Sequence, residues 1–148
     1  MLDVIHDRHL KIALVLGRFS LFVVYFWFGA LKLIGLSPAS PMVQELLKTT
    51  MPFMGFSTFI VLFACFEMLI GVLFLIPRLE KIAFSLFVIH MATTIMPLFL
   101  MPDMTWQGFL TPTLEGQYII KNIVLVGVAF FIYVTTETKA PKEIEIGG

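Results

Sequence analysis

Four long apolar runs alternate with short polar segments along this chain. The runs cover residues 12–36, 56–76, 82–101 and 118–134. At ~1.5 Å of rise per residue, about twenty helical residues cross the ~30 Å hydrocarbon core of a bilayer. Short connections favour antiparallel packing of consecutive helices, so the pattern predicts an all-α membrane protein. We expect residues 1–148 to form a single domain, an antiparallel four-helix transmembrane bundle.

The segments between and after the runs carry signals of their own. Residues 42–49 have the pattern of a short amphipathic helix lying at the membrane surface. Residues 77–81 predict a tight charged turn, and residues 102–117 predict an irregular loop. The charged segment 135–148 is expected to be a disordered tail.

Basic residues that flank the runs predict the orientation of the bundle. Six of them fall on one side: Arg8, Lys11, Arg78, Lys81, Lys139 and Lys142. The other side carries only Lys48. Because cytoplasmic loops of membrane proteins carry an excess of Lys and Arg, both termini are expected to be cytoplasmic.

The composition is typical of a membrane protein and limits the kinds of partner that we expect. Charged residues make up 14% of the 148 residues, whereas a soluble domain usually has about 25%. The net charge of zero gives no indication of nucleic-acid binding. The expected partner is the lipid bilayer, with other membrane subunits or a second copy of the chain left open. The single cysteine, Cys65, cannot form an internal disulfide or a CxxC redox pair.

Glu67 lies in the middle of the second run, where a carboxyl group is costly. Insertion there costs ~2.5–3.5 kcal/mol of free energy, so we expect Glu67 to be paired or used. Measured from the cytoplasmic ends of the spans at ~1.5 Å per residue, Arg18 lies ~9 Å deep, His90 ~12 Å and Glu67 ~14 Å. These depths predict contact between Arg18 and Glu67. On the first helix, Arg18, Tyr25 and Lys32 are spaced by seven and share one stripe.

A second group of polar residues lies in the outer half of the bundle. With Glu67 paired to Arg18, Lys32 and Lys121 have no further carboxylate within the predicted membrane region. Two buried ammonium groups would lose protons or attract an anion. If the last helix starts near Thr113, Glu115 lies in its first turn. We therefore expect Glu115 to turn inward and cap the two lysines. A ligand headgroup would then lie between Lys121, Asn122, Thr94 and Glu67.

Each of these residues also has an ordinary explanation. An ion pair between Arg18 and Glu67 could only fix the helix register, or Glu67 could exchange a proton or contact a polar ligand. His90 could be a satisfied core histidine, and a haem is not indicated because no other run contains a histidine. Lys32 could extend to the outer interface. The sequence contains no catalytic set, phosphate loop or zinc spacing, so we assign no catalytic or metal-binding residue.

Three segments resemble a known family. They read GRFSLFVVYFWFGALKLIG in the first run, FEMLIGVLFLIPR in the second and EGQYIIKNIVLVG at the last. Together they resemble the DoxX-like superfamily of small four-helix membrane proteins, and within it the YkgB/RclC-like family. That family has an Arg and a Gly-x-x-Lys on its first helix, a Val-Glu-x-x-x-Gly on its second and a Gly-Arg-x-x-x-Lys-Asp that opens its fourth. Arg18, Lys32 and Glu67 stand at the charged positions of the first two helices. Gln117 and Asn122 stand where the family tends to have Arg and Asp.

The resemblance implies a four-helix fold and a multi-pass protein of the bacterial inner membrane. Its better-studied members are linked to quinone-coupled sulfur oxidation and to oxidant resistance.

The first functional expectation is a small-molecule or quinone-binding or accessory membrane module, not an enzyme on its own. The alternatives are a structural subunit of a larger membrane complex and a quinone-linked oxidoreductase subunit that receives electrons from a partner. No resident cofactor is indicated, and a quinone or a lipid stays open as the ligand. The candidate ligand-binding or polar-cluster residues are Arg18, Lys32, Glu67, His90, Thr94, Glu115, Gln117, Lys121 and Asn122.

Overall fold

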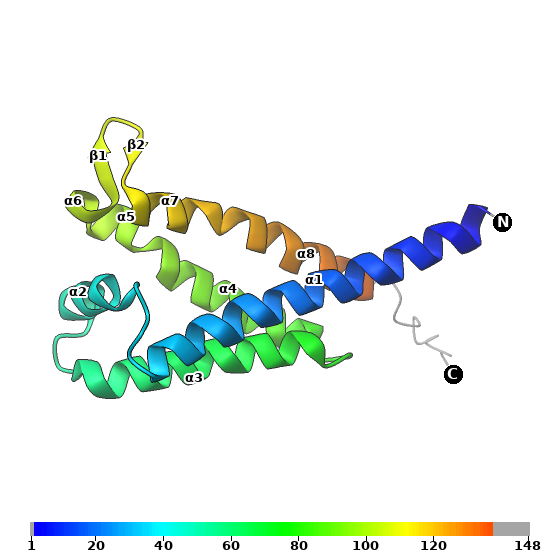
Figure 1. The fold of residues 1–148 in the computed structure, drawn as a ribbon, viewed down its shortest axis with the longest axis horizontal. Helices are drawn as coiled ribbons and strands as arrows, with labels where there is room; N and C mark the ends of the chain where they lie inside the picture. Colours follow the sequence, from blue (N-terminus) through cyan, green and yellow to red (C-terminus); the bar gives the residue numbers. More distant parts are fainter. Residues whose placement is uncertain (1, 138–148) are drawn as a thin grey trace, which may run out of the picture.

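The computed structural model describes residues 2–137, with side chains from Asp7 onward. The described residues are mainly helical (Figure 1). Within the described residues, four stretches are long and apolar enough to cross a membrane: Asp7–Leu33, Phe56–Leu75, Glu80–Leu100 and Leu114–Glu137. The predicted all-α, multi-pass membrane protein is confirmed at this level.

Two spans are single helices and two are interrupted. The first two spans are α1 (Leu2–Leu33) and α3 (Phe56–Leu75). The third joins α4 (Glu80–Ile95) to α5 (Pro97–Leu100), and the fourth joins α7 (Leu114–Lys121) to α8 (Ile123–Glu137). The predicted runs coincide with these helices, and their ends differ by a few residues. The largest difference is at the start, where α1 already begins at Leu2 and so includes the polar residues before residue 12.

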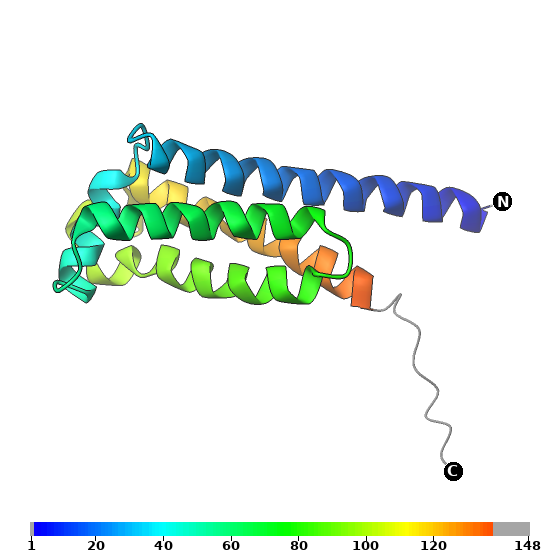
Figure 2. The same ribbon diagram turned by 90° about the horizontal axis from the view of Figure 1, so that it is seen from below.

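Consecutive spans run antiparallel. The start of α1, the α3–α4 turn and the end of α8 therefore lie at one end of the bundle (Figures 1 and 2). The other end carries α5 and four short elements: α2 (Ser40–Thr50), α6 (Pro102–Thr105), β1 (Trp106–Gly108) and β2 (Thr111–Pro112).

The short elements refine three sequence predictions. Helix α2 confirms the amphipathic surface helix, and its buried residue is Leu47. The predicted irregular loop 102–117 is largely ordered, because it contains α6, the β1–β2 hairpin and the start of α7. Of the predicted tail 135–148, residues 135–137 still belong to α8, and residues 138–148 lie outside the described residues.

Small residues allow α1 and α3 to approach closely along their length. A Cβ atom at Gly71 would lie 3.1 Å from Tyr25 Cβ and 3.2 Å from the Phe22 carbonyl oxygen. A Cβ atom at Gly29 would lie 2.8 Å from the Ala64 carbonyl oxygen. Between membrane helices, close packing of this kind replaces the hydrophobic driving force that water supplies to soluble proteins.

Helix α1 ends in a hydrogen-bonded cap at Gly35. Gly35 has a φ of +73°, a conformation that glycine adopts without a Cβ penalty. Its N–H donates to the Lys32 carbonyl at 3.2 Å, and the Leu36 N–H donates to the Leu31 carbonyl at 2.9 Å. These two bonds form a Schellman motif, so Lys32 lies in the last turn of α1.

The remaining helices close on this pair around an apolar core. The largest fully buried apolar side chains come from α1, α3, α4 and α8: Leu21, Ile70, Phe74, Phe87 and Ile132. Helix α8 crosses α1 at Gly17, where an added Cβ would lie 3.3 Å from both Val128 and Ile132. Contacts of α1 with α8 are few compared with those of α1 with α3, so α1 is attached mainly on one side.

We predict that Gly29→Ala destabilises the bundle by about 1–3 kcal/mol, the usual cost of overpacking. The added methyl group would meet Met68 Cγ at 2.7 Å and the Ala64 backbone oxygen at 2.8 Å. Gly127→Ala is the matched control, because no atom lies within 4 Å of its added Cβ and alanine favours the helix. The free energy of unfolding in mild detergent measures both variants. Equal stability of the two would contradict the close α1–α3 approach.

Candidate functional site

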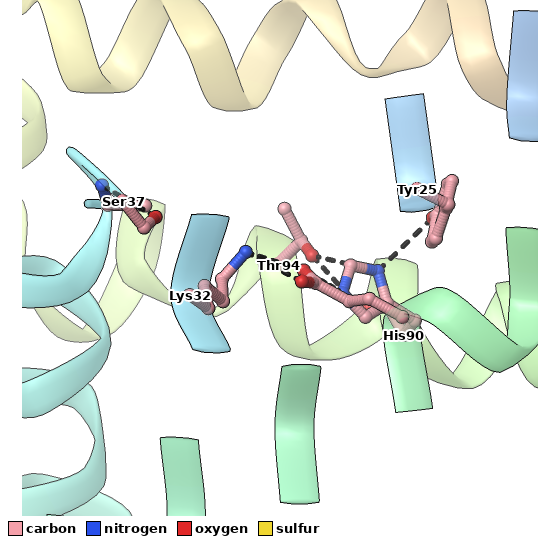
Figure 3. Close-up of polar contacts among 7 residues, drawn as sticks. Tyr25, Lys32, Ser37, His90 and Thr94 are labelled. Atoms are coloured by element: carbon pink, nitrogen blue, oxygen red, sulfur yellow. Dashed lines mark hydrogen bonds and ion pairs between the residues drawn. The ribbon is translucent and has the colours of Figure 1, made fainter. Parts of the chain in front are cut away.

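Helices α1, α3 and α4 bring four polar side chains together inside the bundle (Figure 3). Lys32 Nζ donates to the two carboxylate oxygens of Glu67 at 2.9 and 2.7 Å. His90 Nε2 lies 3.0 Å from Glu67 Oε1, and His90 Nδ1 lies 3.2 Å from the Tyr25 hydroxyl. Each of these residues is at most 7% exposed. We call Tyr25, Lys32, Glu67 and His90 the buried network.

An arrangement of protons without net charge satisfies every contact of the buried network. In it, Glu67 is a carboxylate, Lys32 is an ammonium, and His90 is neutral with its proton on Nε2. Nε2–H then donates to Glu67, and Nδ1 accepts a hydrogen bond from the Tyr25 hydroxyl. In this arrangement the network carries no net charge, which lowers the desolvation free energy of polar groups that are removed from water. Among the described residues, no buried side-chain nitrogen or oxygen lacks a hydrogen-bond partner.

Aromatic side chains and Thr94 enclose the network. The Phe63 ring stacks on His90 with centroids 5.2 Å apart, and Lys32 Nζ lies 5.6 Å from the Phe63 centroid. The Thr94 hydroxyl donates to the His90 carbonyl at 3.0 Å and lies 3.4 Å from His90 Nδ1. Lys32, Glu67, His90 and Thr94 are therefore brought together, although the sequence analysis assigns Lys32 to a separate outer group.

The predicted contact between Arg18 and Glu67 is wrong. Arg18 Nη2 pairs with Glu80 instead, and Nη1 donates to the Phe74 carbonyl at 3.1 Å. Phe74 lies in the last turn of α3, where carbonyl groups lack helical partners. Glu80 lies in the first turn of α4, where the helix dipole stabilises a carboxylate. Arg18 thus fastens the α3–α4 turn to α1.

The depth estimate fails because it aligns the ends of the predicted spans, residue 12 with residue 76. That alignment would place Gly71 near Gly17, but Gly71 lies against Phe22 and Tyr25. Helix α1 is therefore displaced by about two helical turns, and its N-terminal part extends beyond α3 (Figure 2). Helical side chains lean toward their own N-terminus, so on antiparallel helices Lys32 and Glu67 lean toward each other.

The expected cap by Glu115 is also wrong. Glu115 lies in the first turn of α7, as predicted, but its side chain is exposed, and so is that of Gln117. The buried positions of α7 are Gly116 and Ile119, because Gly116 packs against the Thr105 carbonyl. This contact turns residues 115 and 117 outward. Lys32 needs no such cap, since Glu67 neutralises it.

Lys121 and Asn122 lie apart from the buried network and line a groove. The groove holds about 260 Å³ between α1 and the α7–α8 junction, and its lining is Val24, Phe28, Lys121, Asn122, Val124 and Leu125. Lys121 Nζ lies 4.3 Å from the centroid of the Tyr118 ring, a cation–π contact that orients the ammonium group. Within residues 2–137, neither an acid for Lys121 nor a hydrogen-bond partner for the Asn122 side chain is present. The groove therefore offers unused donors.

Sequence analysis does not single out Tyr25, Phe63 or Glu80 as site residues. Tyr25 has a signal, because it shares the stripe of Arg18 and Lys32, all three of which point toward other helices. Glu80 lies in the predicted charged turn, and the length of an arginine side chain allows it to reach such a turn from within a span. Phe63 has no signal that separates it from the other aromatic residues of the second span.

The described residues contain no group of three His, Cys, Asp or Glu side chains that could hold a metal ion. No protein-family model, curated protein or solved structure matches the chain. The function therefore has to be inferred from the buried network and from the groove.

We predict that Glu67→Gln lowers the free energy of unfolding by about 3–5 kcal/mol, because Lys32 would stay buried without its counter-charge. Lys32→Met should be costly for the same reason. The double variant should recover part of the loss, since it leaves no unpaired charge. A double-mutant cycle in mild detergent measures this coupling.

The matched control cycle combines Arg18→Met with Glu67→Gln. These two residues share no contact, so their effects should add to within about 0.5 kcal/mol. Additive effects for Lys32 with Glu67, or coupling for Arg18 with Glu67, would contradict the observed pairing.

Proposed function

We propose that the protein is a DoxX-like accessory module of the bacterial inner membrane that binds a small amphiphile, a quinone or a lipid, without catalysing a reaction on its own. The observation that carries this proposal is the groove at Lys121 and Asn122. It combines apolar walls with two hydrogen-bond donors that have no partner within the described chain. Binding sites for small molecules typically have this composition.

The size of the groove supports an amphiphile that is bound only in part. Its volume of about 260 Å³ is below the ~300–1,000 Å³ of pockets that enclose a drug-sized ligand. A headgroup with an acceptor oxygen would take hydrogen bonds from Lys121 and Asn122. Its chain would lie along Val24 and Phe28 and continue into the lipid. A quinone carbonyl and a lipid phosphate both supply such an oxygen.

The buried network suits a structural role better than a ligand site. Lys32, Glu67 and His90 already satisfy one another, and none of them lines the groove. A ligand there would have to displace these internal contacts at a cost in desolvated charge. We therefore assign ligand binding to the groove and helix registration to the network.

The second candidate is a structural subunit of a larger membrane complex, and the complete satisfaction of the buried network favours it. Such a subunit would need no ligand, and its polar cluster would only hold the helices together. A quinone-linked oxidoreductase subunit is the third reading, in which electrons come from a partner chain to a quinone in the groove.

We predict that the protein from a mild-detergent purification carries bound quinone or lipid, detected by mass spectrometry. Lys121→Met should lower the amount per protein several-fold, because it removes the main donor to the headgroup. Lys48→Met is the matched control, because Lys48 is an exposed lysine on α2 and does not line the groove. The class of molecule lost from Lys121→Met identifies the ligand. Equal retention by both variants, together with co-purified membrane chains, would favour the structural subunit.

We also propose that both termini are cytoplasmic. The supporting observation is that Arg8, Lys11, Arg78 and Lys81 lie at the end that carries the start of α1 and the α3–α4 turn, whereas Lys48 lies at the other. A reporter that is active only outside the membrane should be silent when fused after Gly148. The same reporter inserted after Gly108 should be active, and the reverse result would invert the topology.

A further inference from the structure

The tip of the β1–β2 hairpin consists of two exposed apolar residues. Phe109 is 94% exposed and Leu110 is 75% exposed, although both lie in the turn of a hairpin, where polar residues and glycine predominate. Leu110 also has a φ of +53°, a left-handed conformation that is uncommon for a residue other than glycine. Among the described residues, no side chain packs over Phe109 or Leu110 enough to bury it. Their apolar side chains therefore suit an apolar environment outside the bundle.

The base of the hairpin, in contrast, is firmly held. Trp106 Nε1 donates to the Leu98 carbonyl at 3.0 Å, and Thr105 Oγ1 donates to the Met101 carbonyl at 3.0 Å. Thr113 Oγ1 donates to the Met104 carbonyl at 2.7 Å, and the Thr113 N–H donates to the Thr105 carbonyl at 2.9 Å. These bonds connect the hairpin to α5 and α6, so the tip is presented in one direction.

These contacts also set the depth of the tip. Leu98 belongs to the third candidate span, Glu80–Leu100, so the hairpin base is level with the last turns of that span. From this level the hairpin turns away from the side of the bundle and does not extend past its end (Figure 1). Three strand residues reach roughly 10 Å, so the tip stands beside the bundle at the depth where the hydrocarbon layer meets the headgroups.

We propose that the hairpin is a lateral membrane anchor. Phe109 and Leu110 insert into the interfacial region of the leaflet at the end of the bundle that carries α5 and α6. The occupant of this surface is lipid, because a tip at this depth and beside the bundle is surrounded by lipid before any soluble partner can reach it. Aromatic residues are enriched in this region of membrane proteins, and Trp106 at the hairpin base suits it as well. The anchor fixes the depth of the end that carries α5, α6 and the start of α7. It does not depend on ligand binding in the groove.

The test uses the full chain in vesicles of phosphatidylcholine and phosphatidylglycerol. Cys65→Ser supplies a background without the native thiol, and Leu110→Cys provides a site for an environment-sensitive fluorophore. Lys48→Cys is the matched control, because Lys48 is exposed on α2 at the same end of the bundle and carries a charge. Phe109→Cys repeats the measurement with Leu110 intact.

We expect lipids brominated near the glycerol backbone to quench the fluorophore at 109 and 110 several-fold more than at 48. Aqueous iodide should show the opposite order. Strong iodide quenching at 109 and 110 would place the tip in water and overturn the proposal. Protection from both quenchers, with crosslinking between the tip and a second copy of the chain, would overturn it in favour of a protein contact.

Discussion

A carboxylate within the hydrocarbon layer has to find its counter-charge inside the same bundle, and the pair of Glu67 with Lys32 meets this constraint. Much of the fold follows from it. Lys32 can reach Glu67 only if α1 lies about two turns away from a flush alignment with α3. That register requires the close approaches at Gly29 and Gly71. The Gly35 cap then ends α1 about one turn beyond the pair.

The polar groups of the spans fall into two classes, those that have hydrogen-bond or ion-pair partners within the described chain and those that do not. In the buried network and at Arg18, each donor meets an acceptor within the chain. Neutralisation of this kind is costly to break and adds little net stability, so its main effect is to select one register among the helices. Lys121 and Asn122 differ because they line a groove and have no hydrogen-bond partner among the described residues. A polar group that faces lipid without a partner is the more informative sign of a ligand, and for this reason we place binding at the groove.

The sequence predicts the four spans well, because length and apolar content alone determine whether a helix can cross a bilayer. It also places Lys32, Glu67, His90 and Thr94 among the polar candidates. It predicts the wrong partner for Glu67, because Arg18 and Glu67 have similar depths in the membrane only if the ends of the two spans are aligned. The start of α1 at Leu2 and the contacts of Gly29 and Gly71 set the true offset, and both are properties of packing. The outward turn of Glu115 has the same origin, because it follows from the contact of Gly116 with Thr105.

One side of α1 carries most of the specific contacts of the bundle, and the groove is a consequence of this asymmetry. Arg18, Tyr25 and Lys32 recur every seven residues and reach the α3–α4 turn, His90 and Glu67 in turn. The neighbouring face touches α8 near Gly17, close to the opposite end from the α7–α8 junction. Beyond Gly17 no polar contact joins α1 to α7 or α8 within the described residues, so Val24 and Phe28 line an open space. The heptad stripe that neutralises the buried charge therefore occupies one side of α1, and the groove on its other side is where we propose that an amphiphile binds.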